Sequence, residues 1–445
     1  MNIHVENPVW SRVDDIRSLR KFFTYPYVTW TRSGRNVFYR SMVGNTGYFF
    51  TGLIPLIHDD FDLHKYGHTS INVTYGYKRK CSTFEVPIQI GKYTLEPHQS
   101  EMVRAALQHS RGILQAPTAA GKTIAFAAML KAWNGSALIL QRSTDLMYQT
   151  QKVLQEVLGV FVGIVGDQKL DIQNTTVAMV PSLKNWSTED IRNHFPVDTV
   201  IIDEAHHAQA KTYVKILKAL RCERRIGVTA TPKEKKEDID SYYKITGLIG
   251  PILYRATVHD APKRIAKPML QMLNYGNPGH IPFMWPDCYT HGIVRNIQRN
   301  QKVIGIARYY ARRDKSVLIV VKRIEHGELL QETYPAAEFV QGKDDAETRQ
   351  AVKTLLNGRN HMAIATNIFS EGVDIPKLDV IVNAAGGLSK TATIQQAGRV
   401  LRRTEGKEVG LIVDFWDPYN KYLRKHSNQR YAQYREVLDA QLVEE

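Results

Sequence analysis

About a quarter of the way along the chain the sequence reads Ala116-Pro117-Thr118-Ala119-Ala120-Gly121-Lys122-Thr123. The apolar run Gly112-Ile113-Leu114-Gln115 precedes it, and the helix-forming residues 125–130 follow it. A strand, a tight turn of small residues and a helix whose amino end points backbone N–H groups at an anion form the context of a phosphate-binding loop. Ala116 departs from the usual pattern, which begins with Gly. The residues expected to bind a nucleoside triphosphate here are Ala119, Gly121, Lys122 and Thr123.

The chemistry of an ATP site needs a lysine, a metal and a general base. We expect Lys122 to reach the β and γ phosphates and the Thr123 hydroxyl to hold Mg²⁺. A second apolar run ends in Ile202-Asp203-Glu204-Ala205-His206. Asp203, at the carboxyl end of this strand, would bind the metal, and Glu204 would take a proton from the water that attacks the γ-phosphate. An acidic helix start is the alternative interpretation, but the combination with Lys122 and Thr123 favours ATP.

Strand-like apolar runs alternate with helical stretches from about residue 93 onward. Runs of this length, separated by helices, are typical of strands buried on both faces of a parallel sheet. The runs are Gly112–Gln115, Ala137–Leu140, Thr176–Val180, Thr199–Ile202, Val317–Val321, Met362–Ala365 and Val380–Val382. A stretch rich in Pro and Gly interrupts the pattern between about Gly250 and Arg295. The sequence therefore predicts an α/β fold of two doubly wound parallel-sheet domains joined by a connector.

The two ends of the chain have a different texture. Residues 1–92 are rich in aromatic and basic residues and favour a small α+β domain, with most aromatics in its core and some free to stack on bases. The domains expected are residues 1–92, residues 93–262, and residues 263–445 with a basic tail.

Two segments of the last domain allow two interpretations each. We expect the tail from Lys421 to Arg435 to form a solvated helix face rather than a phosphate-binding strip. We expect Tyr275–Pro286 to form a buried connector rather than a loop whose Phe283 and Trp285 wedge between strands.

The amino-acid composition indicates a folded protein and the kind of partner that it binds. The 445 residues have a net charge of +15, with 43% hydrophobic and 23% charged residues. This balance excludes wholesale disorder, and the surplus of positive charge favours a polyanion such as nucleic acid. Cys81, Cys222 and Cys288 form no CxxC pair, which gives no support for a zinc ribbon or a disulfide framework and favours a reducing compartment. The sequence has neither a secretory signal nor an apolar run of about 20 residues, so we expect a cytoplasmic protein without a membrane span.

With these motifs in their order, the chain resembles the superfamily 2 DEAH-type DNA helicases, whose motor is a pair of RecA-like domains. The resemblance covers about residues 93 to 417. Its further segments are Gln141–Gln149, Val180–Leu183, Asp203–His206, Thr229–Pro232, Ala365–Pro376 and Gln395–Arg402.

The resemblance implies a role for each matching residue. Catalytic roles fall to Lys122, Asp203, Glu204, Arg399 and Arg402. Contacts with ATP are implied for Gln99, Gly372 and Asp374, and coupling of the ATP site to strand movement for His206, Thr229 and Thr231. Nucleic-acid contacts are implied for Arg142, Ser182, Thr229, Lys322, Arg323, Thr366 and Asn367. The two arginines suit their role because a planar guanidinium can clamp the negative charge of a phosphoryl-transfer transition state.

Within the superfamily, the chain looks similar to phage branch-migration helicases of the UvsW type. That likeness implies a monomer in the host cytoplasm that acts on forks and Holliday junctions in DNA replication, recombination and repair, with the N-terminal domain on duplex DNA. Two alternatives stay open. The same motor could act on RNA, because discrimination by the 2′-OH is invisible in the motifs. ATP could also switch the affinity of a nucleic-acid clamp that separates no strands.

Overall fold

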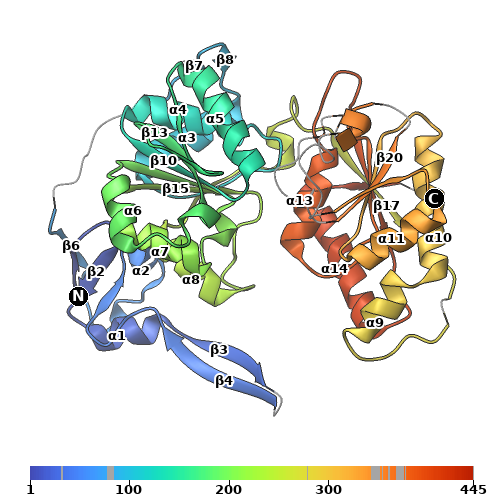
Figure 1. Cartoon of the computed structure of the whole chain (residues 1–445). Helices are drawn as coiled ribbons and strands as arrows, with labels where there is room; N and C mark the ends of the chain where they lie inside the picture. The colour runs from blue at the N-terminus through green and yellow to red at the C-terminus, as the bar shows by residue number, and fades with distance from the viewer. Residues whose placement is uncertain are drawn as a thin grey trace. The chain divides into compact units, whose positions relative to one another are not determined.

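In a computed structural model, the chain is described at residues 1–31, 34–77, 85–277, 279–341, 351–352, 354–358, 361–366, 375 and 377–443. It divides into two compact units (Figure 1). The first contains residues 1–116 and 122–256, and the second contains residues 117–121 and 257–445.

The first unit is built on an eight-stranded sheet in the order β12-β11-β13-β10-β14-β15-β9-β16. Every neighbouring pair is parallel except β11 with β12. Its strands are β9 (Arg111–Gln115), β10 (Ala137–Gln141), β11 (Gly163–Gly166), β12 (Lys169–Asp171), β13 (Thr175–Met179), β14 (Thr199–Asp203), β15 (Arg224–Thr229) and β16 (Ile252–Arg255). The expected strands from Gly112, Ala137, Thr176 and Thr199 are therefore confirmed.

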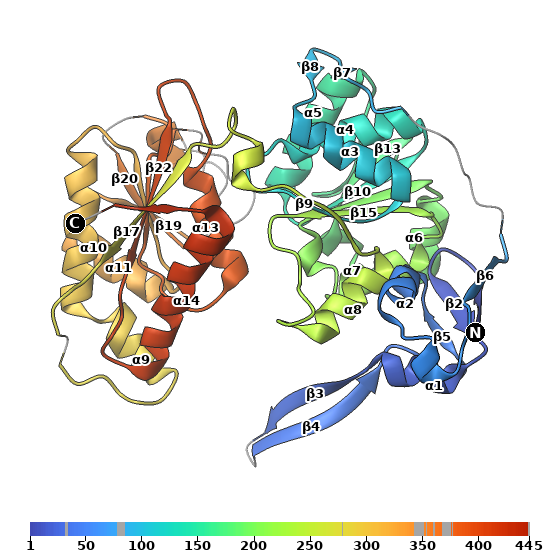
Figure 2. The ribbon, with the colours of Figure 1, turned by 180° about the vertical axis from the view of Figure 1, so that it is seen from behind.

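Helices cover both faces of this sheet. Figures 1 and 2 show α3, α4 and α5 on one face and α6, α7 and α8 on the other. Their bounds are α3 (Pro97–His109), α4 (Lys122–Trp133), α5 (Thr144–Leu158), α6 (Thr188–His194), α7 (Lys211–Ala219) and α8 (Ile239–Leu248). Because both faces are covered, strand β10 is buried at all five positions, which explains its continuous apolar run.

The N-terminal residues form the α+β module that the composition predicts. Its sheet has the order β5-β2-β1-β6, and β3 and β4 form a separate two-stranded hairpin. The bounds are β1 (Asn2–Val5), β2 (Trp10–Val13), α1 (Ile16–Phe22), β3 (Thr24–Thr31), β4 (Gly34–Ser41), β5 (Tyr48–Phe50), α2 (Ile54–Asp60) and β6 (Asn72–Tyr75). A second short hairpin, β7 (Gln89–Ile90) with β8 (Tyr93–Thr94), leads into α3. Phe23, Tyr25, Phe49 and Phe61 lie in the core of the module, and Phe38 and Tyr39 are exposed.

This module packs directly on α8 of the same unit. Tyr243 of α8 belongs to the hydrophobic core of the module, and the Tyr25 hydroxyl donates a hydrogen bond of 2.7 Å to Asp240. Gly52 allows the backbones to meet, because a Cβ there would stand 2.6 Å from the Gly247 carbonyl oxygen. The base of the hairpin is thus fixed to α8 of the first unit.

The second unit holds a seven-stranded sheet in the order β19-β20-β18-β21-β22-β17-β23, parallel throughout. Its strands are β17 (Lys267–Leu273), β18 (Val317–Val320), β19 (Glu338–Val340), β20 (Met362–Ala365), β21 (Val380–Asn383), β22 (Val409–Phe415) and β23 (Gln441–Leu442). Figures 1 and 2 show α10 and α11 on one face and α13 and α14 on the other. The helices are α9 (Asp287–Tyr289), α10 (Ile297–Ala311), α11 (Ile324–Thr333), α13 (Lys390–Val400) and α14 (Lys421–Leu438). The prediction of two doubly wound parallel sheets is confirmed.

The segment between Gly250 and Arg295 is more than the connector we expected. It contributes β16 to the first sheet and β17 to the second. The expectation of a buried connector at Tyr275–Pro286 is also wrong in part, since Tyr275 is buried but Phe283, Met284 and Trp285 are exposed. These three residues precede α9 in a loop whose backbone is anchored by Asn420.

The expectation of a solvated helix face for the basic tail holds for four exposed basic residues of α14 but is wrong at Arg430; the exposed residues are Lys421, Arg424, Lys425 and Arg435. One face of α14 is buried, formed by Leu423, Ser427, Arg430, Tyr434 and Leu438. Arg430 is fully buried and pairs with Asp414 and Asp417 at the end of β22. The helix is therefore part of the fold of the second unit, and Arg430 belongs to neither a solvated face nor a phosphate-binding strip.

The sequence predicts no membrane span and gives no support for a disulfide framework, and the described residues bear on both points. Among them, no helix is long and apolar enough to cross a membrane. Cys222 and Cys288 are buried free thiols, and Cys81 lies outside the described residues.

Candidate nucleotide and nucleic-acid site

The expected phosphate-binding loop connects β9 to α4. Ala119 and Gly121 both have left-handed backbones, with φ of 70° and 78°. A left-handed alanine is uncommon and costs free energy, which is typical of strained backbone at functional sites. Helix α4 begins directly after the loop, at Lys122, with Thr123 as its second residue. The N–H groups in the first turn of an α-helix have no carbonyl partner within the helix, which suits this turn to bind an anion.

Lys122, Asp203 and Glu204 meet at one edge of the sheet. Lys122 Nζ lies 3.4 Å from Glu204 Oε1, and Asp203 is the last residue of β14. Glu204 has a left-handed backbone, with φ of 49°, so the chain turns sharply there. The structure thus brings together three of the five residues for which we expected catalytic roles.

The charges of this cluster stabilise one another. Burial alone would raise the pKa of Glu204, but Lys122 and His206 hold that pKa well below its ordinary value. Burial is also the main cause that raises the pKa of Asp203, against the attraction of Lys122. For Lys122, burial would lower the pKa, but the charges of Glu204 and Asp203 raise it. Glu204 is therefore ionised at neutral pH, as a proton acceptor must be.

A hydrogen-bonded chain connects Glu204 to the segment Thr229–Thr231. His206 Nδ1 lies 2.8 Å from Thr229 Oγ1 and 3.3 Å from Glu204 Oε2. Thr229 Oγ1 in turn accepts a bond of 3.1 Å from the Thr231 backbone N–H. These contacts join the three residues for which the resemblance implies coupling.

The remaining expected residues of the first unit are spread around this cluster. Gln99 is fully buried, and its side-chain oxygen accepts a hydrogen bond from the Glu96 backbone N–H in the capping box of α3. Arg142 follows β10 and contacts His207, with Nη1 and Nε2 2.6 Å apart. Ser182 is half-buried in a short helical turn after β13.

In the second unit, the two expected arginines lie at one helix end. Arg399 is in the last turn of α13 and Arg402 follows that helix by two residues; both are half-buried. Lys322 and Arg323 follow β18, and Thr366 follows β20. Asn367, Gly372 and Asp374 lie outside the described residues.

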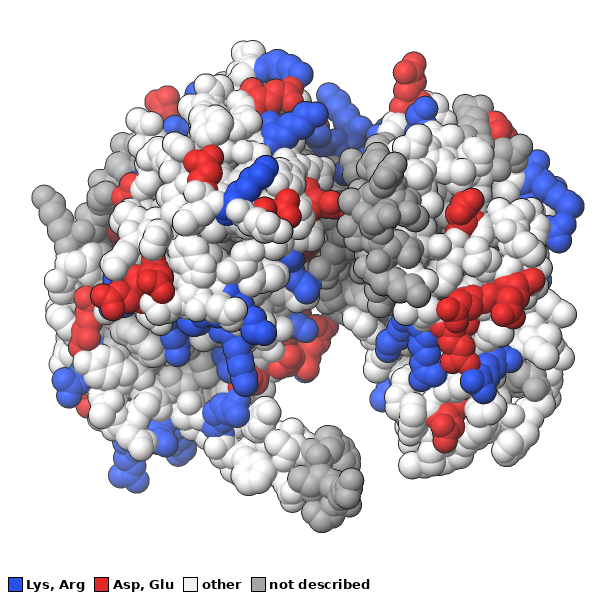
Figure 3. Space-filling view, viewed as in Figure 1, with Lys and Arg blue, Asp and Glu red and all other residues white. Residues whose placement is uncertain are grey.

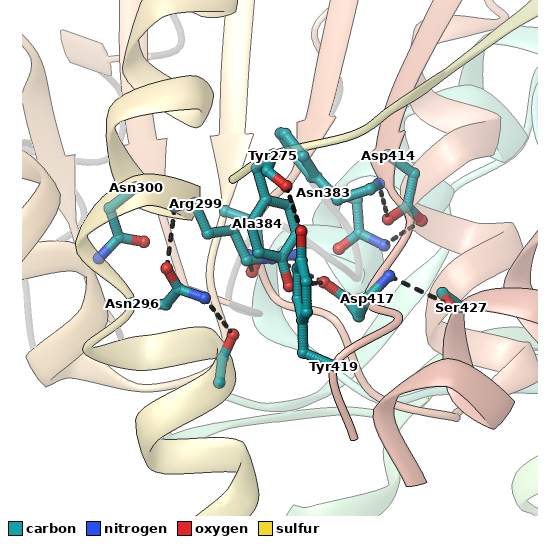
Figure 4. Close-up of polar contacts among 12 residues, drawn as sticks. Tyr275, Asn296, Arg299, Asn300, Asn383, Ala384, Asp414, Asp417, Tyr419 and Ser427 are labelled. Carbon is teal, nitrogen blue, oxygen red and sulfur yellow. Dashed lines mark hydrogen bonds and ion pairs between the residues drawn. The ribbon is translucent and has the colours of Figure 1, made fainter. Parts of the chain in front are cut away.

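Three buried side chains hold the connection from β21 to α13. Arg299 Nη1 donates to the Ala384 carbonyl at 2.7 Å, the Tyr289 hydroxyl to the Ala385 carbonyl at 2.7 Å, and Arg430 Nη1 to the Gly387 carbonyl at 3.0 Å. Arg299 and Arg430 are also held by Asp417; Figure 4 shows Arg299, Ala384 and Asp417 in this cluster. The entry to the helix that carries Arg399 is therefore fixed from three separate elements.

Sequence reasoning missed four polar residues of these sites. Gln141 donates from Nε2 to Asp203 Oδ2 at 3.2 Å, and its position at the end of a buried strand beside β14 was the available signal. The other three residues contact carbonyls far away in the sequence: Tyr289 at a separation of 96 residues, Arg299 at 85 and Arg430 at 43. No local sequence pattern indicates such contacts.

Comparison with known proteins agrees with this architecture. The family described as "Type III restriction enzyme, res subunit" matches residues 92–234, and the "Helicase conserved C-terminal domain" family matches residues 298–404. Together they cover just over half of the chain.

Individual relatives have low sequence identity to this chain, but they match it over most of its length. The DNA 3′-5′ translocase XPB2 of Sulfurisphaera tokodaii is 25% identical over 373 residues, which cover 73% of this chain and 82% of that protein. The ATP-dependent DNA helicase uvsW of Enterobacteria phage T4 is 25% identical over 380 residues, covering 75% and 71%. Among solved structures, the Mycobacterium smegmatis helicase Lhr bound to ssDNA and AMP-PNP has a TM-score of 0.55 at 17% identity, over 78% of this chain and 49% of that one.

The chain belongs to the superfamily 2 helicases and is an ATP-dependent helicase that binds nucleic acid.

Proposed function

We propose that this helicase remodels branched DNA, by branch migration and unwinding at forks and four-way junctions, with residues 1–92 as its duplex-binding domain. The observation that carries the proposal is the β3–β4 hairpin of the N-terminal module. Similarity to the uvsW helicase, over 75% of the chain, supports the same assignment.

The hairpin presents basic and apolar side chains to solvent. Its strands pair at eight successive positions, and Val37, Phe38 and Tyr39 are 45%, 57% and 76% exposed. Figures 1 and 2 show the hairpin extending away from the rest of the first unit. Arg35 and Arg40 of the hairpin are exposed, and on the face seen in Figure 3 further Lys and Arg side chains lie near the base of the hairpin. Exposed aromatics beside basic groups suit a partner with phosphates and bases.

For ATP hydrolysis, we assign Lys122 to the β and γ phosphates and Glu204 to the attacking water. Arg399 and Arg402 would stabilise the charge of the transition state. Gln99, Gly372 and Asp374 would contact the nucleotide. His206 would pass the state of this site to Thr229 and Thr231 through the contacts described above.

The residues present fit Mg²⁺ bound together with ATP. Among the described residues, no group of three or more His, Cys, Asp or Glu side chains could hold a metal alone. Thr123 and Asp203 would supply two oxygens, and phosphates and water the others, which is the usual way in which Mg²⁺ is held. The ion would neutralise charge on the phosphates.

The DNA track proposed from the family pattern reads no bases. Arg142, Ser182, Thr229, Lys322, Arg323, Thr366 and Asn367 would contact the sugar-phosphate backbone. Such contacts position a strand without reading its sequence, as a motor on arbitrary DNA requires.

We place the protein in the cytoplasm as a monomer. The buried free thiols Cys222 and Cys288 support a reducing compartment.

Four substrates distinguish this proposal from the alternatives. ATP hydrolysis and strand exchange are measured on fork DNA, a four-way DNA junction, linear duplex DNA and an RNA duplex. We expect ATP-dependent remodelling of the fork and junction at rates well above those on linear duplex. Activity dominated by RNA would overturn the DNA assignment, and hydrolysis without strand movement would favour the ATP-switched clamp.

The hairpin gives a prediction of its own. Replacing Phe38 and Tyr39 by Ser is expected to weaken fork binding about 5- to 150-fold, the range for loss of one stacked base, while single-strand-stimulated ATPase falls less. Point substitutions are preferable to removing residues 1–92, because removal would expose Tyr243. Fork affinity is measured by fluorescence anisotropy. Leu170→Ser, at another exposed apolar residue of the first unit, is the matched control; equal losses of binding and ATPase would indicate a role in folding instead.

A further inference from the structure

The loop before α9 exposes three consecutive large apolar side chains. Phe283, Met284 and Trp285 are 56%, 63% and 43% exposed. Contiguous exposed apolar surface is a feature of interaction sites, and these three side chains follow one another in the chain. The catalytic roles assigned above leave these three residues without a function.

The backbone of this loop is held in place while its side chains point outward. Asn420, the N-cap of α14, donates from Nδ2 to the carbonyls of Pro282 and Phe283 at 3.2 and 3.4 Å. The Cys288 N–H donates to the Met284 carbonyl at 2.9 Å. The exposure is therefore built into the fold and does not come from an unanchored segment.

Basic side chains accompany the rings at both ends of the loop. Lys421 Nζ lies 4.2 Å from the centroid of the Phe283 ring. Trp285 packs against Tyr289, with ring centroids 5.2 Å apart. The same Tyr289 ring is approached by Arg323 at 5.0 Å and by Lys322 at 5.7 Å.

These contacts make one strip within the second unit. Phe283 and Trp285 are its exposed rings, and the buried ring of Tyr289 joins Trp285 to Lys322 and Arg323, the pair already proposed to contact phosphates. Figures 1 and 2 show α9 beside α14 at the lower end of this unit. Alternation of exposed aromatic rings with cations is the arrangement that binds single-stranded nucleic acid, because bases stack on the rings while phosphates meet the charges.

We propose that Phe283 and Trp285 form a stacking platform for unpaired bases of one DNA strand, continuous with the phosphate contacts of Lys322 and Arg323. This inference rests on the proposed function in taking the strand to be DNA. The platform would hold bases after their pairs have separated. A blunt duplex, whose bases are already stacked on one another, would use it little.

The test compares single-stranded and duplex binding by the full chain without ATP. Wild type, the double variant Phe283→Ser/Trp285→Ser and Lys322→Ala are titrated with a labelled 20-nucleotide oligothymidylate and with a blunt 20-base-pair duplex. We expect the double variant to lose about 5- to 150-fold in affinity for the single strand for each stacked base, with duplex affinity changed less than about threefold. Lys322→Ala should weaken both complexes and lower the salt dependence of binding, because it removes a phosphate contact.

A matched control is Val160→Ser/Phe161→Ser, which removes a 49% and a 65% exposed apolar side chain from the first unit and should leave both affinities unchanged. Thermal melts check the fold of each variant. Unchanged binding by the Phe283/Trp285 variant, or equal loss on single strand and duplex, would overturn the platform and leave the loop as a surface for a protein. Loss confined to a matched oligouridylate would assign it to RNA. Wild type that bound neither DNA would overturn the proposed function and the platform together, whereas wild-type binding that the Phe283/Trp285 variant leaves unchanged would overturn the platform alone.

Discussion

Replacing Glu204 by Gln is expected to lower kcat for ATP hydrolysis about 10²- to 10⁴-fold, the usual contribution of a general base. The amide has nearly the shape of the carboxylate but cannot accept a proton from water at neutral pH. Since Lys122 holds the pKa of Glu204 low, the wild-type side chain is fully in the accepting form. ATP binding should persist, because the backbone of residues 119–121 and the first turn of α4 do not depend on Glu204.

Steady-state hydrolysis and the affinity for a fluorescent ATP analogue separate these two effects. Glu189→Gln, an exposed change in the first turn of α6, is the matched control and should behave as wild type. Strand displacement should disappear together with turnover. If Glu204→Gln retained turnover with an unchanged thermal melt, Glu204 would not be the general base. If the variant still displaced strands without hydrolysing ATP, strand displacement would not depend on ATP hydrolysis.

The meeting of Lys122 with Asp203 and Glu204 was predictable because its signals are local. Ala119, Gly121 and Lys122 lie in a short loop between a strand and a helix, an order that predicts an anion site. Asp203 could be added because a carboxylate at the end of a buried parallel strand must lie at the same sheet edge as the loop after β9. Even the contact of His206 with Thr229 follows from β14 and β15 being neighbours in the sheet.

The corrections concern residues whose environment comes from distant parts of the chain. Arg430 looks like one more basic residue of a tail rich in Lys and Arg, and only the pairing of α14 with the end of β22 buries it beside Asp414. Trp285 lies in a segment rich in Pro and Gly that gives no periodicity. The loop that carries it is anchored by Asn420, which donates to the carbonyls of Pro282 and Phe283, 138 and 137 residues earlier in the chain. Composition could not decide either case.

Replacing Arg430 by Met is expected to destabilise the second unit by about 3–5 kcal/mol, the cost of leaving a buried charge without its partner. Arg430 and Asp414 are fully buried, with Nε 2.8 Å from Oδ2 and Nη2 2.9 Å from Oδ1. Met fills similar volume but satisfies neither carboxylate oxygen, and it also releases the Gly387 carbonyl at the entry to α13. Urea unfolding, followed by a probe in the second unit, measures the loss. Arg424→Met, at an exposed arginine of the same helix, is the control for a lost surface charge.

A double-mutant cycle shows whether the cost comes from the unpaired charge or from packing. Asp414→Asn should also destabilise, and Arg430→Met/Asp414→Asn should cost less than the sum of the two single changes, because the double variant leaves no uncompensated charge at this pair. Additivity within about 0.5 kcal/mol would contradict the pairing.

The pH dependence of the stability tests the same pair. Burial alone would raise the pKa of Asp414, but Arg430 holds that pKa below its ordinary value. A carboxylate with a lowered pKa stabilises the fold above its unfolded pKa, and this contribution is lost as the pH falls through the folded value. The stability of wild type should therefore fall more steeply below about pH 4 than that of Asp414→Asn.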